Sequence, residues 1–189
     1  NLTVKNYTKE PDVDLEASLS EFDLGAFMTA KTAVTAPKSA AAGQAAAPPS
    51  NKPPMSSRGK FQVGVLKHSN SQARDVRLTW DLSGMTADLK RLSGAAKLSS
   101  TGGRFSNLGD MASQSKVVKV LIFPVMIFQK IGRIGGIRLF PDFNNVEYTE
   151  LAGDYVFNDG VMTLRDSHLN SAAGDVTATG FIDLPAERL

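Results

Sequence analysis

The 189-residue sequence contains no cysteine, only two histidines and a single tryptophan. Without cysteine the chain can form no disulfide bond, no iron–sulfur cluster and no thiol nucleophile. The histidines, His68 and His168, each stand beside serine in turn-like or strand-end contexts, and they lack the spacing of metal ligands. We therefore expect both histidines at the surface, and we expect neither a metal ion nor a cofactor.

Signatures of catalysis and of nucleic-acid binding are also missing. The glycines at 132, 135 and 136 lack the spacing of a dinucleotide-binding loop, and no G-x-S-x-G motif occurs. The net charge is only +2, and the basic residues do not alternate with aromatic residues on a strand. We expect no enzyme and no nucleic-acid partner. The acidic residues near the C-terminus leave a hydrolase with an unrecognised acidic site as a minor alternative.

The longest apolar stretch, residues 117–128, is too short to be a good transmembrane span. Ten of its twelve residues are large and apolar, the exceptions being Lys119 and Pro124. This composition predicts a helix over about 108–131 with a kink at Pro124. One interpretation is a core helix that covers one face of a sheet. The other is a helix whose apolar surface meets lipid while flanking cations meet phosphate head groups; these cations are Lys116, Lys119, Lys130 and Arg133.

Most of the remaining sequence alternates apolar and polar residues with a period of two, which is typical of β-strands. Val76, Leu78 and Trp80 share one face of a predicted strand, and the intervening residues point to the other face. The same alternation occurs in residues 13–19, 61–65, 92–98, 151–157 and 176–184. The pattern predicts a β-rich α+β fold, a curved antiparallel sheet of roughly six to nine strands with one main helix.

Two short motifs predict tight turns between strands. Asn158-Asp159-Gly160 is the strongest hairpin signal in the chain. Thr101-Gly102-Gly103 follows the strand at 92–98, and it predicts a hairpin that turns the chain back toward Phe105.

Composition divides the chain into three parts. Residues 30–57 consist mostly of Ala, Pro, Ser, Gly and Lys, which predicts a mobile linker. Residues 1–29 precede it as a strand and a short helix that Asp23 caps. Residues 58–189 follow it as a β-rich domain. Both ends of the sequence lie within strand-like patterns, so we expect a fragment of a longer protein, truncated at the C-terminus, with any membrane anchor outside it.

Several motifs occur in a fixed order along the chain. They are FDLGAF at 22–27, the Ala/Pro linker, LSGMTADLKRLSG at 82–94, TGGRF at 101–105, GDYVFNDGVMTL at 153–164 and VTATGFIDL at 176–184. In this order the chain resembles the C-terminal portion of the AsmA-like family. The resemblance implies a periplasmic protein attached to the inner membrane of a Gram-negative bacterium, related to bridge-like proteins whose long β-sheet has an apolar groove for phospholipids. It implies a role in lipid homeostasis or outer-membrane biogenesis, and no catalytic residue.

The resemblance and the strand pattern together predict a lipid-binding site. Acyl chains are expected to lie between an inward stripe of the sheet, Val76, Leu78 and Trp80, and one face of the predicted helix, Leu121, Val125 and Phe128. We expect a non-enzymatic module that binds or conducts phospholipid acyl chains. The alternative is a structural or assembly factor that binds other envelope proteins through its sheet edges and its apolar helix.

Overall fold

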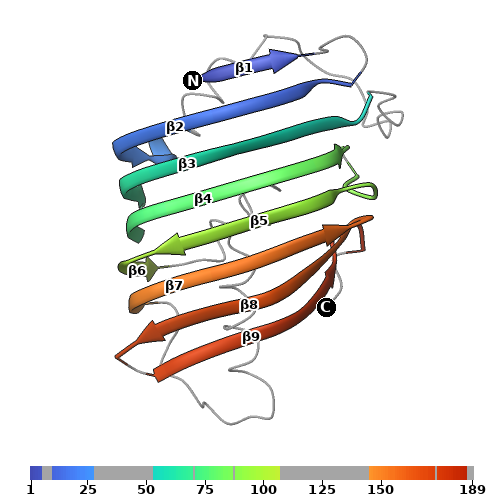
Figure 1. Ribbon diagram of the computed structural model, residues 1–189. Helices are drawn as coiled ribbons and strands as arrows, with labels where there is room; N and C mark the ends of the chain where they lie inside the picture. Colours follow the sequence, from blue (N-terminus) through green and yellow to red (C-terminus); the bar gives the residue numbers. More distant parts are fainter. Residues whose placement is uncertain are drawn as a thin grey trace, which may run out of the picture.

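The computed structural model describes residues 1–5, 10–27, 53–69, 71–86, 88–106, 145–172 and 174–186, and these form one curved sheet (Figure 1). The strands are β1 Leu2–Lys5, β2 Asp12–Asp23, β3 Met55–His68, β4 Ser71–Met85, β5 Ser93–Ser100, β6 Gly102–Ser106, β7 Asn145–Asn158, β8 Val161–Ser171 and β9 Gly174–Asp183. The predicted β-rich, curved sheet is confirmed.

The strands lie in the order β1-β2-β3-β4-β5-β7-β8-β9, with β6 between β4 and β7. Neighbours are antiparallel except β2 and β3, which are parallel and pair from Asp12–Ser56 to Asp23–Lys67. β3 begins at Met55, three residues before the predicted start of the domain at residue 58, and the N-terminal strands β1 and β2 belong to the same sheet as the other described strands.

The predicted hairpin at Thr101-Gly102-Gly103 is wrong. β5 and β6 both lie between β4 and β7, and both run antiparallel to these neighbours. The register against β4 continues across the break, since Ser99 lies opposite Arg77 and Gly102 opposite Arg74. The glycines therefore interrupt one continuous strand and do not reverse the chain.

The hairpin at Asn158-Asp159-Gly160 is confirmed. Asn158 pairs with Val161 across a two-residue loop, and Asp159 and Gly160 have φ angles of 45° and 80°. Positive φ at both central positions is the requirement of a type I′ turn, whose twist matches that of the strands it joins.

Only a short helix, residues 24–27, occurs in the described part of the chain. The backbone N–H of Ala26 donates to Asp23 Oδ1 at 2.9 Å, so the predicted capping role of Asp23 is confirmed. The predicted main helix at about 108–131 lies outside the described residues. The described residues therefore form a sheet accompanied by one helical turn.

A line of irregular residues bends the sheet across β2 to β7. At this line two successive inward-facing residues of a strand are three positions apart instead of two. In β4 these residues are Val76 and Ala73. Asp75 sits at the shift with a φ of 48° and accepts a 2.7 Å hydrogen bond from Thr101 Oγ1. Such bulges increase local twist and turn a strand aside, and the ends of β3 and β4 curl accordingly (Figure 1).

Candidate functional site: the inner face of the sheet

The two faces of the sheet differ sharply in chemistry. The face that carries the buried side chains, here called the inner face, includes Val63, Val76, Leu151, Met162 and Ile182. Register partners continue this face from strand to strand, and none of its positions in the described strands holds Asp, Glu, Lys or Arg. The opposite, outer face holds the charged residues. Alternation along each strand separates the two sets.

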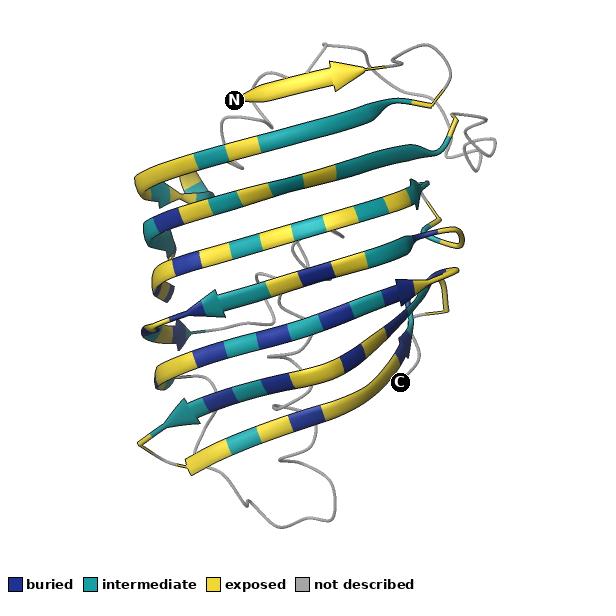
Figure 2. Ribbon diagram, in the orientation of Figure 1, coloured by how far each residue is buried: buried dark blue, intermediate teal, exposed yellow. Residues whose placement is uncertain are grey.

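Burial of the inner face decreases from β9 toward β1 (Figure 2). Met162 and Ile182, on β8 and β9, are each only 1% exposed. At the other end, Leu2 and Val4 on β1 are 66% and 47% exposed, and Leu19 on β2 is 40% exposed. The side chains of the inner face are thus buried at β7 to β9, here called its closed part, and exposed at β1 and β2. We call the exposed inner-face residues of β1 and β2 the open edge.

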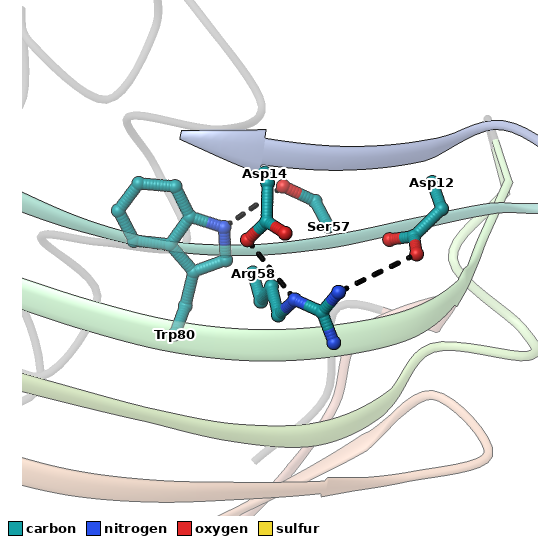
Figure 3. A network of polar contacts seen from close by, with 5 residues as sticks. All are labelled: Asp12, Asp14, Ser57, Arg58 and Trp80. Carbon is teal, nitrogen blue, oxygen red and sulfur yellow. Dashed lines mark hydrogen bonds and ion pairs between the residues drawn. The ribbon is translucent and has the colours of Figure 1, made fainter. Parts of the chain in front are cut away.

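Trp80 lies flat against the inner face instead of standing away from it. Its strand partner is Gly59, and a Cβ at that glycine would lie 2.7 Å from Trp80 Cζ2. The indole Nε1–H donates to Ser57 Oγ at 2.9 Å (Figure 3). Glycine here leaves space for the ring, and the hydrogen bond fixes its orientation.

Two tyrosines repeat the arrangement of an aromatic ring over glycine. Tyr148 places its hydroxyl 2.8 Å from the Cβ position of Gly103, its strand partner, and its ring stacks on Phe105 at a centroid distance of 4.7 Å. Tyr155 lies over Gly153 in its own strand, with its hydroxyl where a side chain of residue 153 would begin. The inner face is consequently a smooth aromatic and aliphatic surface.

The outer face is charged and largely self-neutralised. Arg58 pairs with Asp14 at 3.0 Å and with Asp12 at 3.7 Å (Figure 3), and the hydrogen bond from Arg58 lowers the pKa of Asp14. An open depression of about 600 Å³ surrounds this network. Its lining includes Lys60 and Lys97 besides Arg58, balanced by Asp14, Glu16 and Asp81. This balance selects no ligand of one charge, so the outer face is a weaker candidate than the inner face.

The structure brings together half of the predicted apolar site. Val76, Leu78 and Trp80 share the inner face as predicted, Val76 buried and the other two half-buried. The other predicted site residues, Leu121, Val125, Phe128, Lys116, Lys119, Lys130 and Arg133, lie outside the described residues.

The prediction of two surface histidines is wrong for His68. Its side chain is 6% exposed at the end of β3, and its imidazole faces Gly25 in the short helix. His168 is partly exposed and lies 3.5 Å from Glu150. The bend explains the error, because the shift after Val63 turns Leu66 and His68 inward against the strict alternation.

Sequence reasoning also missed Ser167 on the inner face. Strict alternation from Met162 and Leu164 would place Asp166 inward, but a bulge between Leu164 and Ser167 turns Ser167 inward instead. Ser167 is 1% exposed. No local motif marks this bulge, so only the register between strands reveals the inward serine.

Comparisons with models of protein families, with curated proteins and with solved structures find no match to this chain. The AsmA-like resemblance therefore stays a prediction from the sequence. Within the described ranges, no helix is long and apolar enough to cross a membrane. The same residues contain no group of three or more His, Cys, Asp or Glu arranged to hold a metal ion.

Proposed function

We propose that this chain is a non-enzymatic module that binds or conducts phospholipid acyl chains along its inner face. The observation that carries the proposal is the continuous inner face, which lacks charge in every described strand and is exposed at the open edge. An exposed apolar surface rimmed by polar residues marks a ligand or partner site. Acyl chains suit a face without charge, because each buried methylene contributes about 0.8 kcal/mol.

The dimensions of the inner face also suit lipid. The sheet has eight strand positions from edge to edge; the seven spacings between them, each about 4.8 Å, make the face about 34 Å wide. This width is comparable to the hydrocarbon core of a bilayer, about 30 Å. The AsmA-like resemblance adds to this proposal a periplasmic protein attached to the inner membrane, acting in lipid homeostasis or outer-membrane biogenesis.

Trp80 provides a direct test, since it is the single tryptophan and lies half-buried on the inner face. Short-chain phospholipid added to lipid-stripped protein should replace water beside the ring and shift its emission to the blue. Titration of this shift gives the dissociation constant. A wild-type spectrum that ignores phospholipid at every concentration would contradict the proposal.

A matched pair of variants separates the two faces. Leu19→Asp places a carboxylate on the inner face at the open edge, and it should weaken lipid binding about 10-fold because an unpaired charge is costly to bury. Ser18→Asp places the same carboxylate on the outer face of the same strand and should bind lipid like the wild type. Leu19 is 40% exposed, so the substitution should leave the fold intact. Equal binding by both variants argues against the inner face.

The second candidate is an assembly factor that binds other envelope proteins, and the edge strand β9 favours it. β9 is ten residues long and pairs with β8 alone among the described strands, and Phe181 on its outer side is 67% exposed. Unpaired edges are sites for strand addition. Native mass spectrometry distinguishes the candidates: co-purified phospholipid supports the first, and a lipid-free protein with a stable protein partner supports the second.

A further inference from the structure

Two hydroxyl groups lie side by side on the closed part of the inner face. Ser167 is the strand partner of Gly153, and the hydroxyl of Tyr155 lies over that same glycine. Tyr155 and Ser167 are 4% and 1% exposed. Their neighbours in register, Ala96, Leu98 and Leu164, are apolar, so the two oxygens form a small polar site among apolar side chains.

Neither hydroxyl has a hydrogen-bond partner among the described residues. Burial raises the pKa of Tyr155 to about 12, which the nearby Ser167 hydroxyl partly offsets, although the two oxygens do not meet hydrogen-bond geometry with each other. The phenol therefore stays a neutral donor at physiological pH. Buried polar groups without a partner are destabilising, so their presence calls for a function or a ligand.

Tyr148 shows the same arrangement with a hydrogen-bond partner for the hydroxyl. Its ring also lies over a glycine, but its hydroxyl shares a 2.9 Å hydrogen bond with Ser100 Oγ. Tyr148 and Tyr155 thus occupy similar sites on the inner face, one with a partner and one without. A hydroxyl is not needed to fill the space over Gly153, because phenylalanine would carry the same ring.

Resting on the proposed function, we infer that Tyr155 Oη and Ser167 Oγ donate hydrogen bonds to an uncharged carbonyl oxygen of the bound lipid, as found in an ester-linked acyl chain. Two converging O–H donors match the two lone pairs of a carbonyl oxygen. The closed part of the face would not suit a carboxylate, since the described residues place no cation on it to neutralise the charge. On the inner face a single row of strand partners joins the open edge to Tyr155; it consists of Leu2, Leu15, Gly59, Trp80, Ala96 and Tyr155.

The test compares dioctanoyl phosphatidylglycerol with its dioctyl ether analogue, which lacks the ester carbonyls. Binding of each to the full chain is measured by calorimetry and by Trp80 emission. The wild type should bind the ester lipid about 25-fold more tightly than the ether lipid, because each of the two neutral hydrogen bonds contributes about 5-fold. Tyr155→Phe and Ser167→Ala should each lower this preference to about 5-fold, and neither should change binding of the ether lipid.

Melting curves without lipid add a second readout. Tyr155→Phe removes an unpartnered hydroxyl and should melt at or above the wild-type temperature. Tyr148→Phe removes the hydrogen bond between the Tyr148 hydroxyl and Ser100 Oγ, so it should melt lower, while it retains the preference for the ester lipid.

Each other outcome overturns the inference. A wild type that binds both lipids equally, or a preference as large in Tyr155→Phe as in the wild type, excludes carbonyl recognition while leaving the proposed function standing. A lower melting temperature for Tyr155→Phe means that the hydroxyl is satisfied within the protein. If neither lipid binds the wild type, the proposed function is overturned together with the inference.

Discussion

At the scale of single residues, aromatic rings over glycines shape the inner face. Gly59, Gly103 and Gly153 lie beneath Trp80, Tyr148 and Tyr155. Glycine weakens a strand because it has no side chain to pack, and a ring laid across it restores apolar contact. In this way bulky aromatic residues cover the backbone without projecting far from the sheet, as the floor of the proposed lipid-binding face requires.

Burial of the two tyrosines predicts a loss of stability in alkali. Burial raises the pKa of Tyr148 and raises that of Tyr155 to about 12, from an ordinary value of 10.0. The stabilisation is complete below pH 10.0, where the phenol is neutral in both states, and is lost as the pH rises toward 12 because only the unfolded chain ionises. At about pH 11, Tyr155 should lower the free energy of unfolding by about 1.4 kcal/mol.

Urea denaturation at about pH 9 and about pH 11 measures this loss. Tyr155→Phe is the control, because it keeps the ring and removes the ionisable group. The variant should lose less stability between the two pH values than the wild type does. The same loss in both proteins would show that Tyr155 does not titrate in this range.

At the scale of elements, the β7–β8 hairpin depends on a glycine. Gly160 has a φ of 80°, and an added Cβ would lie 2.8 Å from the carbonyl oxygen of Leu89 and 3.1 Å from Pro185. Gly160→Val should therefore lower the free energy of unfolding by about 2 kcal/mol, through backbone strain and these contacts. Thermal melting measures the effect. Asp159→Asn should melt like the wild type, since asparagine tolerates positive φ, and a Gly160→Val variant with wild-type melting would contradict the assignment.

The bend across the sheet is a second feature at this scale. Thr101 N–H and Ser100 Oγ both donate to the carbonyl oxygen of Arg74, at 3.1 and 2.7 Å. These bonds replace part of the regular ladder where β5 passes into β6. Specific hydrogen bonds therefore stabilise the bend. Beyond it each strand changes direction, and the inner face still carries no charged residue.

At the scale of the whole molecule, the parallel pairing of β2 with β3 joins the N-terminal segment to the rest. The ladder runs the length of β2, and the pairs Arg58–Asp14 and Lys67–Glu21 lie across it. A site for a specific protease inserted after Gly43 tests this joining. After cleavage, the N-terminal fragment should co-elute with the remainder in size-exclusion chromatography and separate only in denaturant.

Leu15→Pro in the cleaved protein supplies the control. Proline removes a ladder donor from a strand that is paired on both sides, so the N-terminal fragment should then dissociate without denaturant. Dissociation of the unsubstituted fragment would instead support the predicted separation between a lead-in and a domain.

The sequence by itself determined the strands and their faces. Period-two alternation places Val76, Leu78 and Trp80 together because successive side chains of a strand point to opposite sides whatever the strand packs against. The Asn158-Asp159-Gly160 turn was equally predictable, since its backbone requirement is local. Asp23 capping a short helix is a third local feature of this kind.

Only the tertiary structure decided which strands are neighbours and where the alternation shifts. The parallel pair β2–β3 and the continuous strand β5–β6 depend on contacts between residues distant in sequence, which the local pattern does not encode. A single bulge exchanges inner and outer positions for every residue beyond it. For that reason His68 is buried and Ser167 faces inward, and the polar site with Tyr155 could be found only once the register between strands was known.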